Sequence, residues 1–122
     1  MVKVMIIEDS IFERKAISRY LKKAGYNDVI EAGNGEEGLK LANLEKPDIV
    51  LLDLRMPGMD GMDVIGELKK NHRDVKILVV SIIRNKKVVD KCLELGADGY
   101  LSKPVTQENL VEKIKEILAS SS

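Results

Sequence analysis

Short apolar runs alternate five times with longer amphipathic segments along this 122-residue chain. Strict alternation of strands and helices predicts an α/β domain in which a parallel sheet is covered by helices on both faces. The run Ile49 to Leu52 has no polar residue, which is typical of a strand buried on both faces. The five expected strands are Val2 to Ile7, Val29 to Ala32, Ile49 to Leu52, Ile77 to Val80 and Gly99 to Leu101. We therefore expect a doubly wound, flavodoxin-like sheet with the strand order 2-1-3-4-5 and right-handed crossovers.

The segments between these runs carry helix start and stop signals. Ser10 followed by Glu13 fits a capping box, in which each residue's side chain bonds the other's backbone N–H. We expect the core-facing residues of this first helix to be Ile11, Ala16, Ile17 and Leu21. The capping residues expected for the second, third and fifth helices are Asn34, Asp60 and Thr106. Glycines at positions 25 and 96 are expected to end the first and fourth helices.

Composition favours one cytoplasmic domain. Twenty Lys and Arg residues balance twenty Asp and Glu residues, so no net charge favours nucleic acid or an anionic membrane. The apolar start is too short for a signal peptide, and no run approaches the roughly 20 residues of a membrane span. The single Cys92 leaves no internal disulfide. We expect the domain to cover residues 1–119, with residues 120–122 as a frayed tail or an end added by cloning.

Acidic residues follow two strands that the expected order places side by side. Strand one ends in Glu8 and Asp9, and strand three ends in Asp53. Ligands of doubly wound sheets bind beyond the carboxyl ends of the strands, where the strand order reverses. Three clustered carboxylates repel one another, and a divalent cation relieves that repulsion. An all-oxygen ligand set favours Mg²⁺.

The other two strands at this edge end in residues that suit the same chemistry. Ser81 closes strand four, and Lys103 follows strand five. A magnesium ion beside a carboxylate and a lysine suits phosphoryl transfer, and a carboxylate can itself be the nucleophile. Alone, each residue has a simpler interpretation as a helix-start acid, a turn residue, a loop hydroxyl or a solvated charge. Their convergence on one crevice favours phosphoryl transfer.

These residues give the chain a family resemblance. It resembles the receiver domains of bacterial-type response regulators, and is most similar in size to single-domain, chemotaxis-like regulators. The most specific stretches are Asp53 to Gly61, DLRMPGMDG, and Gly96 to Pro104, GADGYLSKP. The pair Glu8-Asp9 and the strand-end Ser81 complete the set, and the resemblance covers essentially the whole chain. The strand order 2-1-3-4-5 is also that of this family.

The resemblance implies roles for the acidic residues. Asp53 would accept a phosphoryl group from a phosphohistidine of a sensor histidine kinase or phosphotransfer protein, or from a small phosphodonor. Glu8 and Asp9 would bind Mg²⁺ together with Asp53, and the backbone carbonyl of Arg55 would be a further ligand. The chain would be a signalling module rather than an enzyme, with no direct nucleic-acid or membrane partner.

The resemblance also implies how the phosphoryl group is sensed. Lys103 and Ser81 would bind its oxygens, and the Lys103–Pro104 peptide bond is usually cis in this family. Tyr100 is similar to the family's switch aromatic, which turns inward once Ser81 moves. The output protein would bind the face made by the fourth helix, fifth strand and fifth helix, on a monomer or a weak, activation-dependent dimer.

Two departures from the family pattern concern the lifetime of the phosphoryl group. The residue after the switch hydroxyl is usually small, but here it is Ile82. Ile83 cannot hydrogen-bond an attacking water, and Arg55 on the other flank is neither an acid nor an amide. Hydrolysis needs an oriented water. We therefore hypothesise a long-lived phosphoryl state.

Three alternatives to the switch remain open. Haloacid-dehalogenase-like phosphatases also use an Asp nucleophile, but they want a second Asp two positions later, where this chain has Arg55. A flavin-binding protein of the same fold would need a hydroxyl-rich phosphate loop after strand one, which the sequence lacks. A receiver-like interaction module that no longer relies on phosphorylation is favoured by the bulky Ile82 and disfavoured by the complete acid set.

Overall fold

Five parallel strands form one sheet in this computed structural model, which describes residues 1–120. The strands are β1 (Lys3–Ile7), β2 (Asp28–Ala32), β3 (Ile49–Leu52), β4 (Lys76–Ser81) and β5 (Gly99–Ser102). Their order across the sheet is β2-β1-β3-β4-β5, and every neighbouring pair is parallel. The predicted fold class and strand order are confirmed, and each expected strand is present to within one residue at either end.

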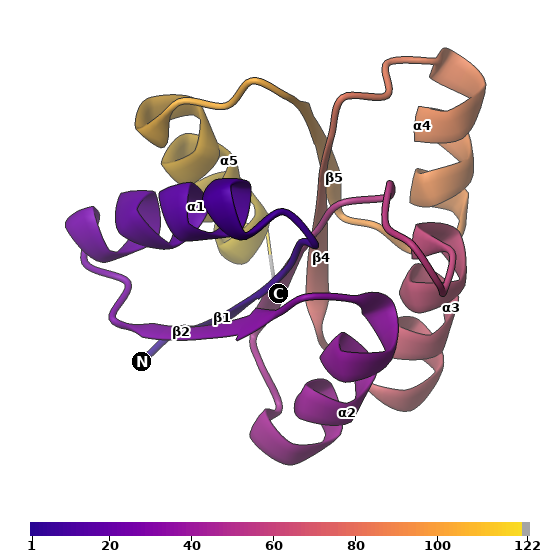
Figure 1. Cartoon of the computed structure of the whole chain (residues 1–122), viewed down its shortest axis with the longest axis horizontal. Coiled ribbons are helices and arrows are strands. Elements are labelled where there is room, and N and C mark those ends of the chain that lie inside the picture. Colours follow the sequence, from indigo (N-terminus) through magenta and orange to yellow (C-terminus); the bar gives the residue numbers. More distant parts are fainter. Residues whose placement is uncertain (121–122) are drawn as a thin grey trace.

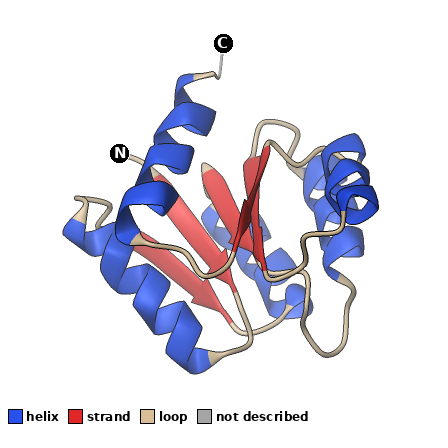
Figure 2. Cartoon of the chain, turned by 90° about the horizontal axis from the view of Figure 1, so that it is seen from above, coloured by secondary structure: helices blue, strands red, loops and turns tan. Residues whose placement is uncertain are grey.

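Helices cover both faces of this sheet (Figures 1 and 2). They are α1 (Ile11–Lys23), α2 (Gly35–Glu45), α3 (Gly61–Asn71), α4 (Lys86–Glu94) and α5 (Gln107–Ala119). α1 and α5 lie on one face, and α2, α3 and α4 lie on the other. None of the helices within residues 1–120 is long and apolar enough to cross a membrane.

Each face of the sheet has its own hydrophobic core, because successive residues of a strand point to opposite faces. In β1, Val4 and Ile6 pack with Ile17 and Leu21 of α1. Their neighbours Met5 and Ile7 pack into the other core. That second core contains Ala42 of α2, Val64, Ile65 and Leu68 of α3, and Cys92 of α4. All four residues of β3 are buried, which explains why its sequence lacks polar alternation.

The predicted caps of three helices are confirmed. The side chains of Asn34, Asp60 and Thr106 accept hydrogen bonds from backbone N–H groups in the first turns of α2, α3 and α5. Thr106 and Asn109 form a complete capping box. Gly25 and Gly96 follow α1 and α4 with φ of 97° and 117°, a conformation that favours glycine.

The start of α1 departs from the prediction. Ile17 and Leu21 are buried as expected, but Ile11 is 66% exposed and the prediction that it faces the core is wrong. Ile11 lies six residues before Ile17, about 120° away from it around the helix, so its side chain points away from the face that Ile17 and Leu21 bury. The expected capping box is only half formed, since the Ser10 side chain accepts from the Glu13 N–H at 3.3 Å. The other half is replaced, because the Ser10 N–H donates to Glu8 at 3.0 Å.

α5 is the last helix of the described residues. Ser120 is the C-cap of this helix, and its backbone N–H donates to the Glu116 carbonyl. Residues 121 and 122 of the predicted tail lie outside the described residues.

Candidate functional site

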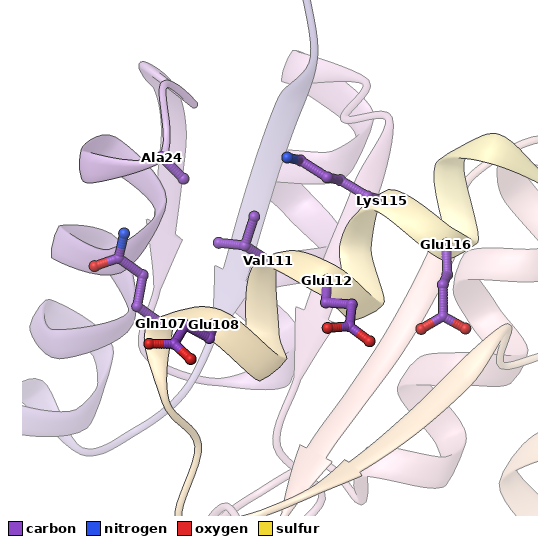
Figure 3. A pocket seen from close by; sticks show the side chains of 7 residues that line it. All are labelled: Ala24, Gln107, Glu108, Val111, Glu112, Lys115 and Glu116. Carbon is purple, nitrogen blue, oxygen red and sulfur yellow. The ribbon is translucent and has the colours of Figure 1, made fainter.

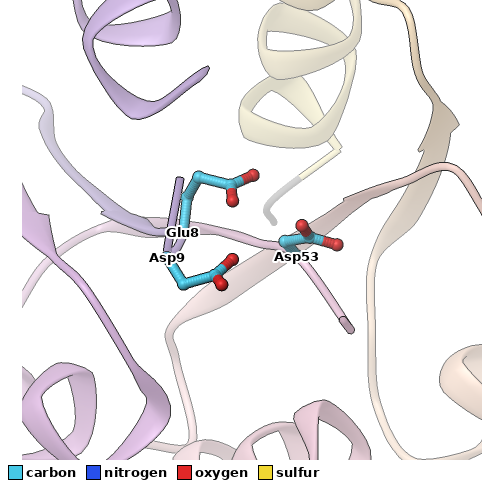
Figure 4. A group of neighbouring side chains, drawn as sticks. All are labelled: Glu8, Asp9 and Asp53. Carbon is cyan, nitrogen blue, oxygen red and sulfur yellow. The ribbon is translucent and has the colours of Figure 1, made fainter. Parts of the chain in front are cut away.

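Three carboxylates meet at the carboxyl ends of β1 and β3. Glu8, Asp9 and Asp53 each offer an oxygen, and these oxygens lie within 4.8 Å of one another. Figure 4 shows the three side chains as neighbours, with the carboxylates of Glu8 and Asp9 pointing toward Asp53. The strand ladder sets this geometry, because the Asp53 N–H donates to the Ile7 carbonyl at 3.1 Å and the Glu8 N–H to Ala32 at 3.0 Å. Glu8 and Asp53 are only 2% and 7% exposed, whereas Asp9 is exposed.

Lys103 brings a positive charge to this group from the end of β5. Its Nζ lies 2.6 Å from Glu8 Oε1 and 3.0 Å from Asp53 Oδ2. A third carboxylate contacts it from α1, since Glu13 Oε1 lies 2.8 Å away. The following peptide bond, Lys103–Pro104, is cis. Lys103 therefore holds two buried acids and one half-exposed acid around a single ammonium group.

The charges of this pocket are poorly solvated. Burial raises the pKa of Glu8 to about 7, and the neighbouring Asp53 adds to this shift while Lys103 opposes it. Burial alone would lower the pKa of Lys103, but its hydrogen bonds to Glu13, Glu8 and Asp53 outweigh burial and raise it. The pocket thus keeps its ammonium charged while two buried carboxylates compete for it.

The donor set fits a small divalent cation. Three carboxylates supply only oxygen atoms, the ligands that Mg²⁺ prefers. A cation among them would offset the repulsion that contributes to the raised pKa of Glu8. The Arg55 backbone lies beside the same group, because its N–H donates to Asp53 Oδ1 at 3.1 Å.

Ser81 and Tyr100 lie on the β4 and β5 side of the pocket. Ser81 is fully buried, its hydroxyl accepts from the Ile83 N–H at 3.2 Å, and its carbonyl accepts from the Lys103 N–H at 2.9 Å. The Tyr100 hydroxyl donates to the Ile83 carbonyl at 2.6 Å, so its ring is partly buried against the loop after β4. Ile83 is thus hydrogen-bonded to the hydroxyl groups of both Ser81 and Tyr100, and the Ser81 carbonyl links this loop to the backbone of Lys103.

The two isoleucines after Ser81 differ in environment. Ile82 is 55% exposed, while Ile83 packs against the core that underlies α2, α3 and α4. Ile82 therefore places a bulky apolar side chain on the surface next to a buried hydroxyl of the site.

The structure adds one side chain that sequence reasoning assigned elsewhere. Glu13 was expected to complete the capping box of α1, but its carboxylate pairs with Lys103. The change follows from Glu8, whose Oε2 accepts the Ser10 N–H that Glu13 would have taken. The sequence contains one signal for this role of Glu13. This first-turn acid lies only four residues after the acid pair that ends strand β1.

The loop after Asp53 is held by a close backbone contact, which a substitution can test. A Cβ on Gly61 would lie 2.7 Å from the backbone Cα of Leu54, so Gly61→Ala must displace the loop that carries Arg55. We expect a loss of about 1–3 kcal/mol in the free energy of unfolding, measured by urea titration. Gly66 in the same helix has open space around it. Gly66→Ala should instead stabilise the protein by up to about 1 kcal/mol, and equal effects would contradict this account.

A surface hollow of about 640 Å³ lies apart from the acidic group. It is lined by Ala24 at the end of α1 and by outward side chains of α5, including Glu108, Glu112 and Glu116 (Figure 3). None of the residues predicted to take part in phosphoryl transfer lines it.

Known proteins match both the sequence and the fold. The family model described as the response regulator receiver domain matches residues 4–115. Protein PilH of Pseudomonas aeruginosa is 36% identical over 121 residues, which cover 98% of this chain and 99% of PilH. A chain of the CheX–CheY–BeF3–Mg²⁺ complex from Borrelia burgdorferi superimposes with a TM-score of 0.93 at 25% identity, covering 96% of this chain and 89% of that one.

A further relative is a multidomain protein. The cyclic di-GMP phosphodiesterase of Thermotoga maritima is 40% identical over 115 residues, which are 94% of this chain but only 30% of that protein. This chain thus spans less than a third of that relative's length, and the phosphodiesterase activity belongs to the longer protein.

Proposed function

Since the chain belongs to the response regulator receiver domain family, we propose that it is a switch controlled by phosphorylation of Asp53. The observation that carries this proposal is the environment of Asp53. Its carboxylate is buried between Lys103 and the acid pair, at the edge of the sheet where doubly wound folds bind ligands. A buried nucleophile beside a fixed ammonium is suited to phosphoryl transfer.

In the proposed reaction, an Asp53 carboxylate oxygen forms a bond to phosphorus while the bond from phosphorus to the donor breaks. The donor's leaving atom, an imidazole nitrogen of a phosphohistidine or an oxygen of a small acyl phosphate, keeps the electron pair. Glu8, Asp9, Asp53 and the Arg55 carbonyl would hold Mg²⁺, which neutralises charge on the phosphoryl oxygens when bound. Lys103 supplies a second positive charge 3.0 Å from Asp53.

We propose that Ser81 and Tyr100 respond to the phosphoryl group. The group brings negative charge and strong acceptor oxygens, which favour new hydrogen bonds from nearby donors. If the Ser81 hydroxyl donates to it, the loop that contains Ile83 shifts, and this loop also accepts the Tyr100 hydroxyl. The change would be presented to an output protein on α4, β5 and α5. A coupling of a few kcal/mol is enough for a large population shift.

The proposed phosphodonor is a histidine kinase or a phosphotransfer protein in the cytoplasm. Ile11 and Phe12 are 66% and 79% exposed and lie two and three residues after Asp9, so a donor protein that reaches Asp53 can cover them. The BeF3 and Mg²⁺ in the Borrelia burgdorferi complex support the proposal that this chain also takes a magnesium ion and a phosphoryl group.

Incubation with Mg²⁺ and acetyl phosphate tests the proposal. We expect a phosphoryl adduct that is stable in acid and labile in base, detected by intact-protein mass spectrometry. Chelation of Mg²⁺ with EDTA should prevent its formation, because the carboxylates then lack their counter-charge. A wild-type protein that forms no adduct would favour the alternative, a receiver-like interaction module, which the exposed Ile82 beside Ser81 keeps open.

We also expect the adduct, once formed, to persist for minutes or longer. Neither Ile83 nor Ile82 can orient an attacking water, and Ile82 adds bulk beside the site. Replacing Ile83 with Gln introduces a group that can hold such a water, and should shorten the lifetime. The measurement is the decay of the adduct after the donor is removed, with Mg²⁺ kept present. A wild-type half-life of seconds would contradict this expectation.

A further inference from the structure

The ammonium group of Lys103 is already surrounded by three carboxylates, two of which accept its hydrogen bonds and one of which forms an ion pair with it. Lysine offers three N–H donors, and three carboxylate oxygens lie within 3.0 Å of Nζ. They belong to Glu8, Asp53 and Glu13. A phosphoryl oxygen on Asp53 that takes up a Lys103 hydrogen bond must therefore compete with these contacts.

The three partners differ in how easily they can be released. Glu8 and Asp53 are almost fully buried, so an unpaired carboxylate at either position would stay in a poorly solvated pocket. The Glu13 side chain is 45% exposed and can exchange its Lys103 contact for water. It also borders an open groove of about 210 Å³ between α1 and the loop after β5, where Phe12, Tyr20 and Pro104 lie. Release of Glu13 is the least costly way to free a Lys103 donor.

The local backbone keeps Glu13 available for this contact. A first-turn Glu commonly bonds the N–H of its own capping residue, but Glu8 already accepts the N–H of Ser10 at 3.0 Å. The Ser10 hydroxyl still fixes the Glu13 N–H, so α1 begins at this point. Glu13 is thus directed to Lys103 by the same acid that lines the pocket.

We propose that Glu13 is a positioning residue that holds Lys103 in the unphosphorylated protein and opposes phosphorylation of Asp53. This inference rests on the proposed function. The Glu13–Lys103 contact is made before the phosphoryl group arrives and is given up afterwards, so it stabilises only the first state. Its carboxylate also adds negative charge near the incoming phosphoryl group, which acts in the same direction.

The test compares three proteins with acetyl phosphate and Mg²⁺: the wild type, Glu13→Gln and a matched control, Glu36→Gln. Glu36 is an exposed first-turn acid of α2, and no ion pair involves it within residues 1–120. A half-exposed ion pair leads us to expect about two- to fivefold faster phosphorylation of Glu13→Gln, and a longer adduct lifetime. Glu36→Gln should match the wild type. An unchanged or slower rate for Glu13→Gln, or an equal gain for Glu36→Gln, overturns the inference.

A second readout needs neither phosphorylation nor metal. Thermal unfolding in EDTA is compared for the wild type, Glu13→Gln, Lys103→Gln and the double variant. Glu13→Gln should lower the Tm in the wild-type background, where it removes a Lys103 contact. It should raise the Tm in the Lys103→Gln background, where it only relieves repulsion among carboxylates. Equal Tm shifts in the two backgrounds overturn the proposal that Glu13 acts through Lys103.

The two proposals fail in different ways. If the wild type forms no adduct, the proposed function is wrong and the inference falls with it. If an adduct forms on the wild type and on Glu13→Gln at the same rate, only the role of Glu13 is wrong.

Discussion

Replacing Asp53 with Asn is expected to abolish the phosphoryl adduct on an otherwise folded protein. An amide oxygen is a much weaker nucleophile than a carboxylate, and the variant also loses one acidic ligand of the proposed magnesium site. Asn keeps the shape of the side chain and one acceptor oxygen, which can serve either Lys103 or the Arg55 N–H, whereas Asp53 accepts from each of them with a different oxygen. The loss should therefore be chemical rather than structural.

Intact-protein mass spectrometry after incubation with Mg²⁺ and acetyl phosphate measures this loss. Asp63→Asn is the matched control, because Asp63 is an exposed residue of α3 that is not part of the acidic group. It should be phosphorylated as fast as the wild type. An adduct of undiminished yield on Asp53→Asn would mean that another residue is the nucleophile, and peptide mapping would then identify it.

The same substitution gives a stability prediction of unusual sign. In metal-free protein, Asp53→Asn removes one of two buried carboxylates that repel each other and compete for Lys103. We expect the variant to be at least as stable as the wild type in urea titrations with EDTA. Residues that serve a reaction rather than the fold often behave in this way.

The grouping of Glu8, Asp9 and Asp53 was predictable from the sequence, because the order of the parallel strands determines which strand ends are neighbours. Once the runs at Ile49 to Leu52 and Val2 to Ile7 are taken as neighbouring strands, Asp53 must lie near Glu8, whatever the side chains around them do. Both cores follow from the same rule, since alternate residues of each strand face opposite layers. These features depend on backbone periodicity, which a single sequence carries well.

The first turn of α1 was predicted incorrectly in two respects. Ile11 lies six residues before Ile17, about 120° away from it around the helix, so helical periodicity itself places Ile11 off the face that buries Ile17 and Leu21. The partner of Glu13 could not be predicted, because it depends on which side chain takes the Ser10 N–H, a competition between groups whose geometry only the folded pocket fixes. The Tyr100 hydroxyl bond to Ile83 is a side-chain orientation of the same kind.

Replacing Lys103 with Gln should destabilise the metal-free protein more than any other single charge change at this site. The ammonium contacts two carboxylates that are almost completely buried, and its removal leaves them facing each other without a counter-charge. Breaking a buried ion pair by removing one partner commonly costs several kcal/mol. The raised pKa of Glu8 limits this cost, because that carboxyl can take up a proton near neutral pH. We expect a loss on the order of 2–3 kcal/mol in the free energy of unfolding.

Urea titration in EDTA at pH 8, above the pKa of about 7 that Glu8 has beside Lys103, gives the clearest measurement. Lys3→Gln is the control, since Lys3 pairs with one half-exposed acid, Glu45, at 3.2 Å and should cost about 1 kcal/mol or less. Adding Mg²⁺ should restore part of the stability lost in Lys103→Gln, because a cation bound only by the folded state supplies the missing positive charge. If Mg²⁺ leaves this variant unchanged while it stabilises the wild type, the carboxylates do not form one cation site with Lys103 beside it. The response of the free energy of unfolding to Mg²⁺ therefore distinguishes a pocket that binds a metal and a phosphoryl group from a buried ion pair that serves only the fold.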